Sequence, residues 1–307
     1  MQINLINTAI KYRVDFSPIE CEGKIYYTLE FILQEETMGI IENVDMRNII
    51  QTFSFQLRSP ISKISNAAES IESNINGKNI NSKNFKAKIT AIDDSCRQLL
   101  RSVSNFIDIT KYSLGLFELE LSLVSVPQFL HNLIKECATQ PNANNIPIKF
   151  HNKNTTCYTN FDEKKITLAI VNIIVNSCMY TKPGNHIDVY LKTNKEAQTF
   201  TITIQDTGVG MDEKTCANAT FPYFTGNSGV NNLPYTQGLG LTLSKYIIEL
   251  HNGSLKITSQ KGIGTTVEIT LPINLSQSPI QVLHSPLPQY IKNKFSIVAI
   301  QFAFEVF

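Results

Sequence analysis

The sequence predicts an α+β protein: an antiparallel helical hairpin followed by an α/β sandwich that has a mixed sheet with helices on one face. Residues 38–76 and 85–110 place apolar side chains every three or four positions, as two long helices with one apolar stripe each would. Residues 117–272 alternate strand-like runs with helical patterns, and hairpin-like turns join some of the runs, which is typical of a mixed sheet. The predicted domains are residues 1–37, 38–115, 116–273 and 274–307.

Composition argues against several classes of protein. The formal net charge of +1 argues against non-specific binding to nucleic acid or to an anionic membrane. The six cysteines include no C-x-x-C pair, so we expect free thiols in a reducing cytosol and neither a disulfide framework nor a zinc site. No stretch approaches the roughly 18 apolar residues of a membrane span, and the first residues lack the pattern of a signal peptide. We therefore expect a cytoplasmic protein.

The N-terminal region, residues 1–37, is predicted to be a β-hairpin. Two strand-like runs, Tyr12–Phe16 and Tyr26–Leu33, flank a turn at Cys21–Lys24. A lone hairpin is rarely stable in water, so it is either the remnant of a domain or packs on another element. The hairpin resembles the last strands of a PAS sensor domain, which often precede a signalling helix.

The two long helices of residues 38–115 are separated by turn-forming residues at Asn76–Asn84, so they are expected to form an antiparallel hairpin. One hairpin leaves half of its apolar stripe exposed, and dimerisation into a four-helix bundle is the natural way to bury it. The alternative is a monomeric hairpin that packs on the next domain.

In residues 116–273, helices are expected over Pro127–Cys137, after the capping residue Asp162, and over Gly238–His251. The predicted strands are Phe117–Val126, Ile148–His151, Cys157–Phe161, Ile187–Thr193, Thr199–Gln205, Ser254–Ser259 and Thr265–Leu271. In the tail, residues 274–307, a proline-containing linker precedes an apolar run, Phe295–Phe304, too short to span a membrane. That run is a strand or helix docked on a core, or the stub of a further domain.

Three pieces in order describe a nucleotide pocket. Asn172 and Asn176 lie one helical turn apart on one face. Asp206-Thr-Gly-Val-Gly210 follows an apolar strand, and Gly238-Leu-Gly-Leu241 opens a helix about thirty residues later. A carboxylate can read an exocyclic amine, glycines let the backbone approach phosphate, and amide oxygens can hold magnesium.

With these motifs, residues 38–272 resemble sensor histidine kinases of two-component systems. The helical hairpin resembles their dimerisation and phosphotransfer domain, and the following domain resembles their Bergerat-type ATP-binding domain. The resemblance implies ATP and Mg²⁺ as ligands, Asn176 and Asn172 as the magnesium and phosphate-side ligands, and Asp206 as the acceptor for the adenine amine. The other residues that it places at the nucleotide are Gly208, Gly210, Phe221, Phe224, Gly238, Leu239 and Gly240, and it makes residues 226–237 a mobile lid.

The hairpin departs from the family at the residues that do the chemistry. Where the family has Ser-His-Glu-Leu-Arg-Thr-Pro-Leu, this chain has Ser54–Ile61, with Phe55 at the acceptor position and Gln56 at the acid/base position. Phenylalanine has no nucleophilic nitrogen, and an amide does not take a proton near neutrality. Phe55 is two residues from the stripe on each side, so it is expected to face outward. Met179 and Thr225 stand where the family usually offers phosphate a positive charge.

The sequence therefore predicts an ATP-binding histidine-kinase homologue that does not autophosphorylate at the usual position. The five histidines all lie outside the helical hairpin, and we interpret each as structural. One alternative is an active kinase that phosphorylates a histidine on a partner chain. The other is a non-catalytic, ATP-gated scaffold that regulates a kinase or response regulator. The expected partners are a second copy or another histidine kinase, and no nucleic acid.

Overall fold

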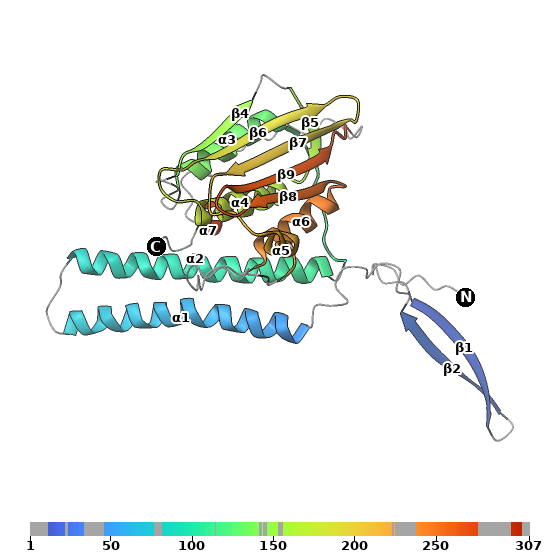
Figure 1. Cartoon of the computed structure of the whole chain (residues 1–307). Helices are drawn as coiled ribbons and strands as arrows, with labels where there is room; N and C mark the ends of the chain where they lie inside the picture. The colour runs from blue at the N-terminus through green and yellow to red at the C-terminus, as the bar shows by residue number, and fades with distance from the viewer. Residues whose placement is uncertain are drawn as a thin grey trace.

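The computed structural model, drawn in Figure 1, describes the chain in segments. These are residues 12–21, 24–33, 46–76, 82–113, 115–140, 143, 146–152, 156–222, 224, 238–275 and 296–302. For residues 12–33 and for a few residues inside the helices, Phe55 among them, only the backbone is described.

The N-terminal hairpin is present and longer than the sequence pattern suggests. Strand β1 (Tyr12–Cys21) pairs antiparallel with β2 (Lys24–Leu33), with Tyr12 opposite Leu33 and Cys21 opposite Lys24. Its relationship to a PAS domain stays a prediction.

Two long helices, α1 (Met46–Asn76) and α2 (Ser82–Ser113), lie side by side as the expected hairpin (Figure 1). The rings of Phe53 and Phe106 stack across it with centroids 4.1 Å apart. Much of the apolar stripe is nevertheless exposed in the single chain, as the sequence predicts. The exposed large apolar residues of the two helices are Ile61, Ile75, Phe85, Ile89, Leu100, Val103 and Ile107.

The C-terminal half contains a five-stranded mixed sheet in the order β4-β6-β7-β9-β8. Only β4 (Ile148–Asn152) and β6 (Ile187–Asn194) are parallel, and all other neighbours are antiparallel. The remaining strands of the sheet are β7 (Thr199–Asp206), β8 (Ser254–Gln260) and β9 (Gly264–Pro272). A separate small sheet pairs β3 (Ser122–Ser125) with β5 (Tyr158–Phe161).

Helices α3 (Val126–Ala138), α4 (Glu163–Tyr180) and α6 (Gly240–Leu250) cover one face of the sheet (Figure 1). Alternate residues of β7, such as Ile202 and Ile204, are buried beneath them, which is the period-2 pattern of a sheet with one covered face. Asp162 caps α4 as expected, because its carboxylate accepts a hydrogen bond from the Lys165 amide at 3.0 Å. The predicted α+β class with a mixed sheet and helices on one face is confirmed.

Three sequence predictions differ from the structure in detail. The strand expected over Phe117–Val126 is only Ser122–Ser125, because the Glu120 amide bonds to the Asp162 side chain at 3.0 Å instead of to a neighbouring strand. The helix expected from Gly238 begins at Gly240, since Gly238 has a left-handed φ of 62°. The short helix α5 (Glu213–Asn218) was not predicted, and α7 (Ile297–Gln301) decides between the strand and the helix that the sequence left open for the tail.

The apolar run in the tail is therefore a helix docked on a core in its described part. Val298 and Phe302 are 2% and 3% exposed and belong to the main hydrophobic cluster. Among the described residues, no helix combines the length and apolar character needed to cross a bilayer.

Candidate functional site

Asp206 is the last residue of β7, and its carboxylate connects three elements. Oδ2 accepts from the Ser177 hydroxyl of α4 at 3.1 Å, while Oδ1 accepts from the Gly208 amide at 3.0 Å and the Thr265 amide of β9 at 3.1 Å. Burial raises the pKa of Asp206, and these three hydrogen bonds act in the opposite direction. A carboxylate has about four acceptor directions, so one direction on Oδ2 is left for a further donor.

Gly208 and Gly210 hold the loop after β7 against the protein's own backbone. A Cβ on Gly208 would lie 2.5 Å from the Tyr180 carbonyl oxygen, and one on Gly210 would lie 2.0 Å from the Gln260 carbonyl oxygen. Gly210 also has a φ of 63°. The loop is therefore pressed between the end of α4 and the β8–β9 turn, and the fold itself requires both glycines.

Asn172 presents a buried amide that has no partner among the described residues. Its side chain is 1% exposed, and neither Oδ1 nor Nδ2 has a hydrogen-bond partner in the described part of the chain. A Cβ on Gly240 would be 3.7 Å from Asn172 Oδ1, so this amide lies directly beside the start of α6. Leaving such a group unpaired costs about 1–3 kcal/mol. Asn176, one turn further along α4, is partly buried.

The N-terminus of α6 has free backbone amides as a consequence of helix geometry. Gly238 has a left-handed φ, and Leu239, the N-cap residue, is buried and supplies no side-chain cap. Thr242 fixes this turn to the preceding segment by donating from Oγ1 to the Thr220 carbonyl at 3.0 Å. The amide of Asn172 and the positive end of α6 therefore face the same space.

The remaining predicted residues lie at the edge of this region. Phe221 is 59% exposed and Phe224 is partly buried. Met179 is partly buried and packs against the core, and it brings no charge to the site. The expected lid, residues 226–237, and Thr225 lie outside the described residues.

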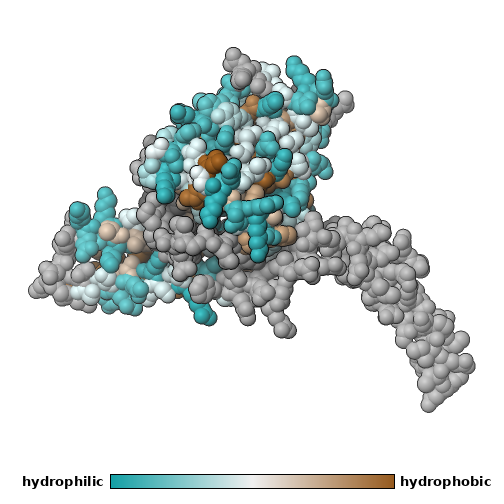
Figure 2. Space-filling model, in the orientation of Figure 1, coloured by the Kyte–Doolittle hydropathy of each residue, from teal (hydrophilic) through white to brown (hydrophobic). Residues whose placement is uncertain are grey.

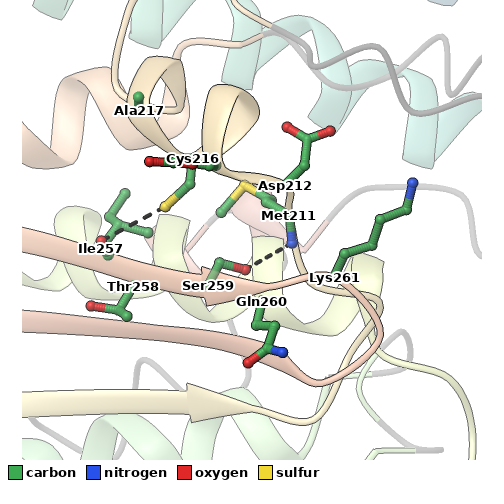
Figure 3. Close-up of a pocket in the computed structure, with 10 residues that line it drawn as sticks. Met211, Asp212, Cys216, Ala217, Ile257, Thr258, Ser259, Gln260 and Lys261 are labelled. Carbon is green, nitrogen blue, oxygen red and sulfur yellow. Dashed lines mark hydrogen bonds between the residues drawn. The ribbon is translucent and has the colours of Figure 1, made fainter.

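A cavity of about 510 Å³ in the described part of the chain lies elsewhere. Figure 3 shows it between α5 and β8, where Met211 N donates to Ser259 Oγ at 2.8 Å and Cys216 Sγ bonds to the Ile257 carbonyl oxygen at 3.7 Å. None of the predicted nucleotide residues lines this cavity. We therefore place the candidate site by the chemistry of Asp206, Asn172 and α6 rather than by cavity size.

Sequence reasoning missed Ser177 and Thr265, which orient the Asp206 carboxylate. Ser177 directly follows Asn176 in the motif, but a serine on a buried helix face gives no sign of its partner. Thr265 contributes only its backbone amide, and no residue type signals that role.

The contacts of His251 agree with its interpretation as a structural residue. Its Nε2 accepts from the Asp162 amide at 3.0 Å, and its Nδ1 lies 2.7 Å from the Ile247 carbonyl oxygen, to which it donates. Burial lowers the pKa of His251, in agreement with a neutral ring that donates from Nδ1 and accepts at Nε2. Both ring nitrogens are thus occupied by the backbone.

The chain is similar to several known proteins. Residues 161–275 match the family described as histidine kinase-, DNA gyrase B-, and HSP90-like ATPase. The sensor protein kinase WalK of Staphylococcus aureus (strain MRSA252) is 24% identical over 264 residues, which is 85% of this chain and 42% of that protein. Histidine kinase P4 of Formosa agariphila is 24% identical over 271 residues, covering 87% of this chain and 19% of that protein. The chain spans less than half the length of these curated relatives.

Two solved structures share the fold. The Acinetobacter baumannii histidine kinase AdeS aligns with a TM-score of 0.52 at 16% identity, over 71% of this chain and 98% of that one. Full-length ShkA in complex with AMPPNP aligns with a TM-score of 0.54 at 14% identity, over 66% of this chain and 41% of that one.

The C-terminal α/β sandwich is thus an ATPase domain of the histidine-kinase type, an ATP-binding class. Over 85–87% of its length, including the helical hairpin in front of this domain, the chain is similar to proteins described as a sensor protein kinase and a histidine kinase.

The close approach of the Gln260 carbonyl oxygen to Gly210 is tested by comparing alanine substitutions at Gly210 and Gly262, two glycines with left-handed backbone. Gly262 has a φ of 82° and open space around a new Cβ, whereas Gly210 has a φ of 63° and a carbonyl oxygen in the way. Gly262→Ala should cost only the left-handed penalty, about 1–2 kcal/mol. Gly210→Ala should lower the free energy of unfolding by more, because the β8–β9 turn must also move. Urea denaturation of both variants measures the difference, and equal losses would contradict the packed loop.

Proposed function

We propose that this chain is an ATP-binding histidine-kinase homologue in two-component signalling that cannot autophosphorylate at the usual position. The observation that carries the proposal is the buried amide of Asn172, which has no partner within the part of the chain that the structure describes and lies beside the N-terminus of α6. The protein pays for this amide in stability unless a ligand bonds to it.

The site suits a nucleotide at both of its ends. The remaining acceptor direction of the fixed Asp206 carboxylate fits an exocyclic amine, which adenine has and which guanine presents at another ring position. The backbone amides at Gly240 fit phosphate oxygens, because the positive end of a helix attracts an anion. Phe221, Phe224, Gly238 and Leu239 are proposed to border the bound nucleotide.

Asn176 and Asn172 are proposed as the protein ligands of a Mg²⁺ ion that accompanies the nucleotide. Among the described residues, no group of three or more histidine, cysteine, aspartate or glutamate side chains could hold a metal. Magnesium commonly keeps several waters and takes further oxygens from phosphate, so one or two amide oxygens are sufficient protein ligands. When bound, the ion would neutralise phosphate charge, while the asparagines orient it.

Phosphoryl transfer to the chain's own hairpin lacks its acceptor. Phe55 lies in α1, five residues before Pro60, and has no nitrogen that could form a phosphoramidate. The prediction that the Phe55 side chain faces outward stays a prediction, because that side chain lies outside the described part of the structure. His251, which is buried in the ATPase domain, has both ring nitrogens bonded to backbone.

Two rival readings differ in where phosphate goes. An active kinase would transfer phosphate to a histidine on a partner chain, and the fixed carboxylate and α6 terminus support retained nucleotide chemistry. A scaffold would only bind ATP and regulate a kinase or response regulator. Met179, which offers no charge, supports the scaffold.

The helical hairpin is proposed to form a four-helix bundle with a second copy or with another histidine kinase. Seven large apolar residues of α1 and α2 are exposed in the single chain. Contact with two further helices would remove such an apolar surface from water.

Nucleotide binding is tested by Asp206→Asn. The amide oxygen can still accept from the Gly208 and Thr265 amides, so the loop should stay folded, but the carboxylate charge that receives the adenine amine is lost. We expect ATP affinity to fall by roughly 1.5–3 kcal/mol, or about 10- to 150-fold. Calorimetry on the wild type and on Asp212→Asn, an exposed carboxylate in the next turn, supplies the control. No binding of ATP or ADP by the wild type at millimolar concentration would end the nucleotide proposal.

Phosphoryl transfer is tested with γ-labelled ATP. The wild type should give no acid-labile label, because the acceptor position carries Phe55. Restoring the acceptor and its acidic neighbour, Phe55→His with Gln56→Glu, should give label if the ATPase domain is competent, since positioning contributes several kcal/mol to transfer. The scaffold reading expects no gain. Labelling of the unmodified chain at any of its five histidines would contradict the proposed loss of autophosphorylation.

Assembly is tested by Ile61→Asp. Ile61 is 53% exposed in the single chain, so the aspartate should leave the hairpin folded but bury an unpaired charge in the bundle, at a cost of several kcal/mol. Light scattering should show a dimer for the wild type and a monomer for Ile61→Asp. Ile263→Asp, at a 62% exposed position on the β8–β9 turn, is the matched control. The bundle would be refuted if the wild type stayed monomeric at high concentration and no partner chain were recovered with it from cells.

A further inference from the structure

The short helix α7 connects the ATPase domain to the helical hairpin. It contacts both α4 and α2, and Figure 1 shows it between them. Val298 and Phe302 are buried in the same hydrophobic cluster as α3 and α4. The described end of the tail is thus part of the ATPase core on one side and touches α2 on the other.

Polar contacts fix both ends of α7. At its start, Ser296 Oγ accepts from the Ala299 amide at 3.1 Å and donates to Glu136 Oε1 of α3 at 3.2 Å. At its end, the Gln301 carbonyl oxygen accepts from Arg101 Nη1 of α2 at 3.1 Å. One end of the helix is therefore bonded to the ATPase domain and the other to the hairpin.

The Arg101 contact is one end of a strip along α2. Arg101, Asp108 and Tyr112 are spaced by seven and four residues, which places them on one helix face. Asp108 Oδ1 lies 3.0 Å from Lys165 Nζ of α4, and Tyr112 stacks on Tyr246 of α6 with ring centroids 4.0 Å apart. The covalent connection after α2, residues 115–121, contains no helix or strand that would set the angle between the two parts.

Two effects act in opposite directions on the docking of α7 on α2. The hydrogen bond from Arg101 Nη1 to the Gln301 carbonyl oxygen favours it. Burial of the Arg101 guanidinium opposes the docking. The Arg101 residue is 7% exposed, and its Nε has no partner in the described part of the chain. Burial lowers the pKa of Arg101 to about 10, so the guanidinium is still charged at neutral pH and its burial is costly. When α7 leaves α2, Arg101 regains water, which offsets part of the loss of that hydrogen bond.

We propose that residues 296–302 are an intramolecular clamp that holds the ATPase domain on α2, and that release of the clamp lets this domain change position relative to α1. The clamp goes beyond the proposed function and does not require nucleotide. It sets where the Asn172 and Gly240 region stands relative to the helix that carries Phe55. A partner that bound the tail would therefore act on that spacing without touching the nucleotide site.

The test measures the distance between the two parts in the full-length chain. Spin labels introduced as unnatural amino acids at Asn66 of α1 and Lys192 of β6, both exposed, leave the native cysteines unchanged. Labelled chain is diluted with unlabelled chain so that only distances within one chain are read. The wild type should give one narrow distance distribution. Arg101→Ala removes the α2 side of the contact, and Val298→Asp detaches α7 from the ATPase core. Each variant should broaden the distribution and shift it to longer distances.

The controls separate release of the clamp from unfolding. Ile263→Asp makes the same kind of change as Val298→Asp at an exposed turn away from α2, and it should leave the distribution as in the wild type. The double variant Val298→Asp with Arg101→Ala should broaden it no more than the stronger single variant, because both changes break one contact. Circular dichroism identifies any variant that unfolds; Arg101→Ala, on the hairpin side, then decides the outcome. A broad wild-type distribution, or folded variants that match the wild type, would overturn the clamp.

Discussion

The buried carboxylate of Asp206 is the constraint on which the nucleotide-binding half of the structure depends. A buried charge must be hydrogen-bonded, and its three donors come from α4, from the loop after β7 and from β9. These bonds fix the end of the central strand, the end of the helix above it and the neighbouring strand relative to one another. The same bonds leave one carboxylate direction for a ligand, and this is the direction proposed to accept the adenine amine.

Much of this arrangement could be predicted from sequence because it repeats at short range. The 3-4 spacing of apolar residues gave both long helices, and the Asp162 cap gave the start of α4. The short helix α5 could not be predicted, and the tail run that holds α7 could not be assigned to a helix or a strand, since five or six residues hold too few periods to show a pattern. The partners of Asp206 come from residues 177 and 265, and contacts over such separations leave no trace in a single sequence.

In the candidate site, too, the sequence motifs could be recognised but the contacts that their residues make could not. The motif glycines were interpreted as room for the nucleotide, but the structure shows that Gly208 and Gly210 first make room for the Tyr180 and Gln260 carbonyls. Their presence is therefore required by folding alone and is weak evidence for a ligand. The same holds for Asp206, whose protein partners already account for three of its acceptor directions.

Asn172 differs from these residues, because the fold does not require its amide group. It can therefore distinguish a chain that uses its nucleotide site from one that only keeps the fold. An apolar side chain of similar volume would fit the same buried position without the cost of an unpaired amide, so packing among the described residues does not explain an asparagine there. A ligand at the start of α6 would explain it, because that ligand would bond to the amide. Without such a ligand, the unpaired amide would only lower the stability of the fold. The presence of Asn172 beside the α6 terminus is thus the strongest physical argument for the proposed nucleotide site, whatever residue stands at position 55.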